Sequence, residues 1–169
     1  LLTTLGTTLS IVAGAIALGL AAGFAAALPR IYRVPVLEQF SQLYASFFRG
    51  TPILIQLFLF YYGLPELLKA VGVDLTRAPV LLFVIATYGL HAGAYISETI
   101  RAAIAAVDRG QVEAAYSVGM SGWQALRIVV LPQALAIGLP VFGNLVIATL
   151  KDTSLAFTLG VMELTGKAQ

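Results

Sequence analysis

The first 29 residues of the chain contain no charged side chain. A helix from Leu5 to Leu28 would exceed the roughly 30 Å of hydrocarbon in a bilayer, because each helical residue adds about 1.5 Å. Of all 169 residues, 59% are hydrophobic and only 11% are charged, whereas soluble domains have about 25% charged residues. So few charged side chains could hardly cover a water-facing surface. The sequence therefore predicts an integral membrane protein.

Three more apolar runs follow, over residues 53–68, 79–97 and 128–150. We expect the first of them to be irregular, because Pro52 precedes it and Pro65 interrupts it. Pro132 and Pro140 predict a kinked or locally unwound helix in the last run. The predicted fold is an all-α integral membrane protein, a multi-span helical bundle with four spans. We expect a fifth span beyond Gln169, so that residues 1–169 are a fragment of a single transmembrane domain.

Two pairs of glycines have the GxxxG spacing, Gly19 with Gly23 and Gly89 with Gly93. Small residues at this spacing let two helix backbones approach closely in lipid. We interpret both pairs as packing sites.

Basic residues in the loops predict the orientation, since Lys and Arg near span ends stay on the cytosolic side. Residues 29–52 carry three arginines and residues 98–127 carry three more, whereas the loop between the second and third spans carries Lys69 and Arg77. We therefore expect residues 29–52 and 98–127 in the cytosol and the N-terminus outside.

The segment 107–127, between the third and fourth spans, has the pattern of a helix, a turn and a second helix. Asp108 with Gln111, and Ser121 with Gln124, have capping-box spacing. Gly119 occupies a position where a helix commonly ends in a left-handed residue. The spacing predicts a short cytosolic helix from about Arg109 to Val118, followed by a helix that leads into the last span.

This segment contains Glu113-Ala114-Ala115 and, after three intervening residues, Gly119. Nine further residues separate Gly119 from Val129, which is followed by Leu131-Pro132. It resembles the EAA loop of ABC importer permeases, with Val129 in place of the family's isoleucine. Three other segments resemble the polar amino acid subgroup of these permeases: 48–56, 95–101 and 151–155.

The resemblance implies a permease subunit of an ATP-driven importer in the bacterial plasma (inner) membrane. Its implied partners are a second permease subunit, identical or different, a cytosolic ABC ATPase dimer and an extracytoplasmic solute-binding protein that delivers amino acids. ATP and Mg would bind to the ATPase, so no cofactor is expected on this chain. The residues implied in coupling to the ATPase are Glu113, Ala114, Ala115, Gly119, Leu131 and Pro132. Ala114, Ala115 and Gly119 would let a partner approach closely.

Polar groups within the apolar spans are the candidates for the solute pathway, because a bilayer penalises such groups. They are Gln56, Tyr61, His91, Asn144, Thr149 and Ser154. For each one, a hydrogen bond between helices is the competing interpretation. The sequence contains no cysteine and no pattern typical of general acid–base catalysis or metal binding, so we do not expect an enzyme.

Three alternatives compete with this interpretation. An ion-driven secondary transporter or channel would also place polar groups in broken helices. Glu98 is the only acidic residue near a span that could couple an ion. Its position at the cytosolic end of the third span favours a structural role instead. Gly119-Met120-Ser121-Gly122 matches the nucleophile motif of rhomboid-type proteases, but we expect Ser121 to be a helix cap. A DNA-binding helix-turn-helix would have its recognition helix continue into the bilayer.

Overall fold

The computed structural model describes residues 2–75 and 78–156, and the regular elements in these ranges are all helices. The helices are α1 (Leu2–Ile31), α2 (Pro35–Gly50), α3 (Ile53–Phe58), the π-helix η1 (Leu59–Gly63), α4 (Leu64–Ala70), α5 (Val80–Ala105), α6 (Arg109–Ser117), α7 (Gly122–Ala125), the π-helix η2 (Leu126–Val130) and α8 (Leu131–Ala156). The predicted all-α class is confirmed.

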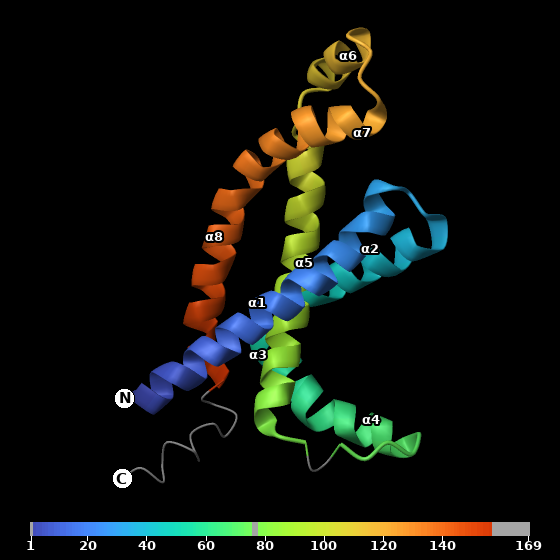
Figure 1. Cartoon of the computed structure of the whole chain (residues 1–169). Coiled ribbons are helices and arrows are strands. Elements are labelled where there is room, and N and C mark those ends of the chain that lie inside the picture. Colours follow the sequence, from blue (N-terminus) through green and yellow to red (C-terminus); the bar gives the residue numbers. More distant parts are fainter. Residues whose placement is uncertain (1, 76–77, 157–169) are drawn as a thin grey trace.

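Helix α5 is the central element of the fold. Figure 1 shows α1 crossing it diagonally, α8 beside it, α6 and α7 at one of its ends and α4 at the other. In the described ranges, four helical stretches are long and apolar enough to cross a membrane: Gly6–Ile31, Ile53–Ala70, Val80–Ala105 and Gly122–Leu155. The four predicted spans are therefore all present as helices.

The crossing of α1 and α5 depends on the two GxxxG pairs. A Cβ atom added to Gly19 would lie 3.0 Å from Ala92 Cβ, and one added to Gly23 would lie 3.1 Å from the carbonyl oxygen of Gly93. On the opposite helix, a Cβ atom on Gly89 would lie 2.8 Å from Leu18 Cβ. The predicted role of these glycines in close helix packing is confirmed.

Replacing Gly93 with alanine is expected to destabilise the folded chain by about 1–3 kcal/mol, as overpacking of a fixed contact does. The new Cβ atom would lie 2.6 Å from the Tyr44 hydroxyl and 2.9 Å from Ala22 Cβ. Gly143 is the matched control, because no heavy atom lies within 4 Å of its added Cβ atom and alanine is the better helix former. Thermal unfolding of the two variants in detergent would measure the difference. Equal midpoints for Gly93→Ala and Gly143→Ala would contradict the close packing of the crossing.

A break in the helical chain lies directly before the second span. Helix α2 ends at Gly50, and α3 begins at Ile53 after extended backbone at Thr51 and Pro52. The break lies beside the middle of α5, because the Tyr44 hydroxyl donates to the Leu90 carbonyl and Gln56 contacts His91. Residues 35–50, between the first two predicted spans, therefore form a helix, and their place in the cytosol stays a prediction. Helix α2 packs against α1 and α5, and its buried residues are Ser41, Ala45 and Phe48.

Two prolines are accommodated by π-helices. Pro65 follows η1 by two residues, and Pro132 follows η2 by two residues. A proline ring clashes with the carbonyl four residues earlier, and the wider turn of a π-helix changes where that carbonyl lies. The predicted interruption at Pro65 is therefore absent, and helix continues to Ala70. In the last span the irregularity lies ahead of Pro132, while Pro140 sits within the uninterrupted α8.

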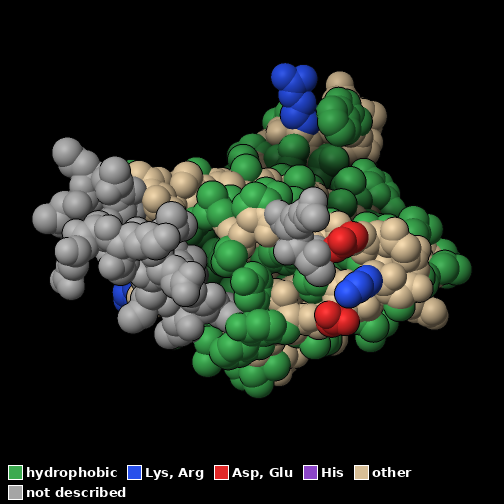
Figure 2. Space-filling view, turned by 90° about the horizontal axis from the view of Figure 1, so that it is seen from below, with side chains coloured by type: hydrophobic (Ala, Val, Ile, Leu, Met, Phe, Trp, Pro, Cys, Tyr) green, Lys and Arg blue, Asp and Glu red, His purple; other side chains and the backbone are tan. Residues whose placement is uncertain are grey.

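The outer surface is largely hydrophobic. Seen from below the view of Figure 1, hydrophobic side chains cover much of the visible face, and the few charged ones gather at one side and at the projecting tip (Figure 2). Along α8 the exposed apolar side chains include Leu135, Leu139, Val141 and Ile147. Such a surface is stable where lipid tails or another apolar subunit replaces water.

Candidate functional site

Helix α6 has well-defined ends that follow from its sequence. The Asp108 carboxylate oxygen Oδ1 accepts a hydrogen bond from the Gly110 backbone N–H at 2.7 Å, which caps the first turn. At the other end, Gly119 adopts a φ of 83°. The Gly119 N–H donates to the Tyr116 carbonyl at 2.9 Å, and the Met120 N–H donates to the Ala115 carbonyl at 3.1 Å. This pair of bonds is a Schellman motif, so the predicted helix end at Gly119 is confirmed.

The next helix begins with the predicted capping box. The Ser121 hydroxyl accepts from the Gln124 N–H at 3.3 Å, and the Gln124 side-chain oxygen accepts from the Ser121 N–H at 2.8 Å. From there α7, η2 and α8 run without interruption to Ala156. The turn at 118–121 therefore connects α6 directly to the helix that forms the last span.

Replacing Ser121 with alanine is expected to remove one bond of this box and to destabilise the turn by about 1 kcal/mol. In the importer that the resemblance implies, solute uptake should stay close to that of the unmodified protein, because the hydroxyl only caps a helix. Uptake into proteoliposomes, with Ser46→Ala as a control for a serine exposed on α2, would test this. Loss of a proteolytic activity in Ser121→Ala would instead favour the rhomboid-type alternative.

An apolar cluster fastens α6 to both long helices. Ala103 near the end of α5 and Val107 just after it pack with Val130 and Ala134 at the start of the last span. Val112 from α6 packs against the same cluster, as do Ile104 and Leu126. Helix α6 is therefore packed against both α5 and the start of the last span.

The Glu-Ala-Ala residues lie on different sides of α6. Glu113 and Ala114 are exposed, whereas Ala115 is buried with 4% of its surface exposed. The Ala115 methyl group packs inside the chain, whereas Ala114 is on the outer side, and close approach of a partner at these residues stays a prediction. Gly119 is exposed, with nothing within 4 Å of an added Cβ atom, and its role in this chain is the left-handed turn.

Leu131 and Pro132 lie on another element, the first turn of α8. Both are exposed, and they directly follow the π-helix η2. Three exposed apolar side chains accompany Glu113 and Ala114 on the α6–α7 hairpin: Tyr116, Val118 and Trp123. Sequence reasoning missed this apolar patch, because the exposed side of such a short helix depends on how the hairpin packs.

Gln56 and His91 come together at the break between α2 and α3. The Gln56 amide nitrogen donates to the carbonyls of Phe48 and Thr51, each at 2.7 Å, and thereby supplies donors to the end of α2. The Gln56 oxygen lies 3.1 Å from His91 Nδ1. Since an amide oxygen only accepts hydrogen bonds, His91 carries a proton on Nδ1 in this contact. Both residues therefore form hydrogen bonds between helices, and this was the alternative to a place in the solute pathway.

The other four pathway candidates lie apart from this contact. The Tyr61 ring packs edge-on against Phe83 beside the core of α1, α3 and α5. The hydroxyls of Thr149 and Ser154 donate to carbonyls of their own helix, those of Leu145 and Lys151. Asn144 is exposed on α8. The structure thus brings together two of the six candidates.

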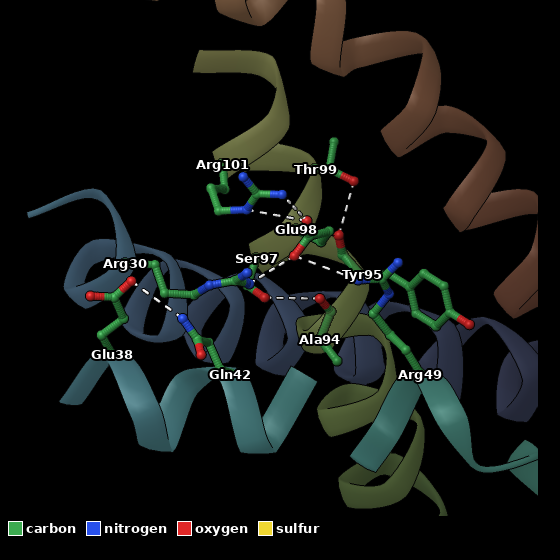
Figure 3. Close-up of polar contacts among 10 residues, drawn as sticks. All are labelled: Arg30, Glu38, Gln42, Arg49, Ala94, Tyr95, Ser97, Glu98, Thr99 and Arg101. Carbon is green, nitrogen blue, oxygen red and sulfur yellow. Dashed lines mark hydrogen bonds and ion pairs between the residues drawn. The ribbon is translucent and has the colours of Figure 1, made fainter. Parts of the chain in front are cut away.

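A cluster of charged residues surrounds Glu98 on α5 (Figure 3). Arg30 from the end of α1 donates to Glu98 Oε2 at 2.7 Å, and Arg101 Nε donates to Oε1 at 3.1 Å. Arg49 from the end of α2 lies 3.5 Å from Oε2. Its guanidinium carbon is 5.7 Å from the centre of the Tyr95 ring. This cluster joins three helices, in agreement with the structural role expected for Glu98.

The sequence contained one signal for this cluster, a carboxylate within an apolar helix. Arg30 and Arg49 are 19 positions apart and count only as loop charges in the sequence. Their convergence depends on α2 folding back along α1 toward α5. Within the ranges that the structure describes, no group of three or more His, Asp and Glu side chains could hold a metal ion.

Comparisons with known proteins agree with this architecture. Residues 15–169 match the family of binding-protein-dependent transport system inner membrane components. The chain is 49% identical over 162 residues to the L-cystine transport system permease TcyL of Bacillus subtilis, covering 96% of this chain and 68% of TcyL. It is also 49% identical over 170 residues to the probable amino-acid ABC transporter permease PatM of Vibrio harveyi, covering 100% of this chain and 74% of PatM.

A solved structure of an amino acid ABC transporter with histidines has a chain of the same fold. The TM-score is 0.76 and the sequence identity 33%, over 99% of this chain and 73% of the other. These findings support a permease of the ABC type over an ion-driven transporter. The chain therefore belongs to the family of inner membrane components of binding-protein-dependent transport systems.

Proposed function

We propose that this chain is the permease subunit through which an ATP-driven importer takes up amino acids in the plasma (inner) membrane of a bacterium. The α6–α7 hairpin carries this proposal, because it stands at one end of α5 and α8 with exposed carboxylate and apolar groups. In this assembly the hairpin faces the cytosol and docks on an ABC ATPase dimer. A second permease subunit completes the membrane pathway, and an extracytoplasmic binding protein delivers the solute.

Coupling follows from how the hairpin is held. Glu113 and Ala114 face away from the chain, while Val112 packs on the cluster shared by α5 and the last span. Closure of the ATPase dimer around ATP would push on the exposed side. The packed side passes that movement to both membrane helices, so the pathway opens alternately to the two faces. ATP and Mg act on the ATPase subunits in this scheme.

Amino acids are the proposed solutes because the two permease relatives are named for L-cystine and for amino acids. The polar groups along α3, η1, α5 and α8 are the proposed pathway: Gln56, Tyr61, His91, Asn144, Thr149 and Ser154. The bond between Gln56 and His91 lies at the break between α2 and α3, and broken helices near the membrane centre are common in solute pathways.

Purification of the full-length protein from its native membranes in mild detergent tests this function. We expect mass spectrometry to identify a stoichiometric ATPase, and reconstituted vesicles to accumulate amino acids only with ATP and the binding protein. A folded permease that reproducibly lacks an ATPase, with uptake driven by an ion gradient, would contradict the proposal.

A further inference from the structure

A cavity of about 410 Å³ lies between α5 and α8. Arg49, Tyr95, Glu98 and Thr99 form its polar end. The remaining lining is apolar: Ala102, Ala103, Ala106, Ile137, Gly138 and Val141. Sites for small molecules usually measure about 300–1,000 Å³ and combine an apolar wall with a few polar groups. The cavity therefore has the volume, the polar end and the apolar wall that suit a small amphipathic molecule.

Glu98 belongs to a charge cluster that carries more positive than negative charge, and Arg49 is the arginine of this cluster that lines the cavity. Three guanidinium groups, those of Arg30, Arg49 and Arg101, converge on Glu98. Within the described residues, Glu98 is the only carboxylate within 4.0 Å of any of them. A cation without a matching anion is costly inside a membrane protein and usually marks a site of function. This end of the cavity therefore favours an anionic group.

Arg49 is the cation whose hydrogen-bond donors remain available. Its contact with Glu98 is 3.5 Å, against 2.7 Å for Arg30, and its side chain is 43% exposed, against 13%. The contact with the Tyr95 ring holds the guanidinium through a cation–π interaction, which uses none of the N–H groups. In Figure 3, Arg49 and Tyr95 lie together on the side of Glu98 opposite Arg30. The planar guanidinium can thus offer two parallel donors to one carboxylate.

We propose that Arg49, held by Tyr95, is a subsite in this cavity for the carboxylate of the transported solute. The apolar lining from α5 and α8 then receives the rest of the molecule. This inference rests on the proposed function and names the chemical group that the pathway recognises. Because Glu98 already balances part of the positive charge, the carboxylate is held weakly enough to leave.

Binding to the complete transporter tests the subsite directly. The full-length permease with its ATPase, without nucleotide and without the binding protein, is placed in phosphatidylcholine nanodiscs. The probe is a radiolabelled mixture of L-amino acids including L-cystine. We expect Arg49→Gln to weaken retention of the probe about 10- to 100-fold, as for the loss of a charged hydrogen bond. Arg49→Lys should lose less, because it keeps the charge without the paired donors.

The matched control is Arg33→Gln, which removes an exposed arginine from the turn between α1 and α2. It should bind the probe as the unmodified protein does. A mixture of the corresponding amino acid amides, which lack the carboxylate, should compete poorly with the probe. Binding by Arg49→Gln at the unmodified level, or equal competition by the amides, would overturn the subsite.

Two further results separate the possible failures. If the unmodified complex neither binds the probe nor takes it up with ATP, the proposed function fails and the subsite fails with it. If ATP-driven uptake is present and Arg49→Gln binds normally, only the subsite is wrong. Repeating the assay in an equal mixture of phosphatidylcholine and phosphatidylglycerol tests whether Arg49 binds a lipid headgroup instead. An Arg49 effect on phosphatidylglycerol retention but not on amino acid binding would assign the cation to a lipid headgroup and overturn the proposal.

Discussion

Replacing Glu113 with lysine is expected to reduce ATP-driven uptake at least tenfold while the permease still folds. Glu113 is exposed on α6, so the substitution changes the surface that we propose docks on the ATPase and leaves the packing of the chain unaltered. Reversing a charge in an interface places like charges together, which costs several kcal/mol, and each 1.4 kcal/mol is about a factor of ten in binding. Uptake and ATP hydrolysis by the reconstituted complex would be measured together.

Two companion variants show whether the effect belongs to this carboxylate. Glu113→Gln removes the charge without reversing it, so its loss of uptake should be smaller. Gln111→Lys adds a positive charge at another exposed position of the same helix. We expect Gln111→Lys to retain most of the uptake. Unchanged uptake in Glu113→Lys would show that this helix does not dock on the ATPase through Glu113, and equal loss in Gln111→Lys would point to the charge of the whole helix.

Replacing Glu98 with glutamine is expected to destabilise the folded permease by about 3 kcal/mol, near the lower end of the range for removing one partner of a buried ion pair. The change leaves three arginines around a neutral group. Arg30 is the most costly of them, because only 13% of its side chain is exposed. Arg49 and Arg101 are more than one third exposed, and solvent screens their repulsion.

Thermal unfolding of the full-length permease in detergent measures this loss, with Glu66→Gln as the control for an exposed carboxylate on α4. The control should differ from the unmodified protein by less than about 0.5 kcal/mol. Adding Arg49→Gln to Glu98→Gln removes one of the uncompensated charges, so the double variant should recover part of the stability. A Glu98→Gln variant as stable as Glu66→Gln would show that the cluster contributes nothing to holding α1, α2 and α5 together.

The sequence alone determined the features that depend on short stretches of chain. Apolar run length predicted the four spans, because a helix must be long enough to cross hydrocarbon whatever its neighbours are. Capping residues predicted both ends of α6, since the Asp108 cap, the Gly119 turn and the Ser121–Gln124 box each form within a few residues. The EAA spacing likewise identified the family.

Other features were decided by the tertiary structure. The exposure of Ala114 and the burial of Ala115 depend on the cluster that fastens α6 to α5 and the last span. Helix α2 packs with one face against α1 and α5, and the chain breaks at Thr51 and Pro52 before the second span begins. Arg30 and Arg49 meet Glu98 only when three helices pack, and no local pattern specifies such a contact. The charge beside the cavity at α8 is therefore set by packing, because packing brings together arginines and a glutamate that are far apart in the sequence.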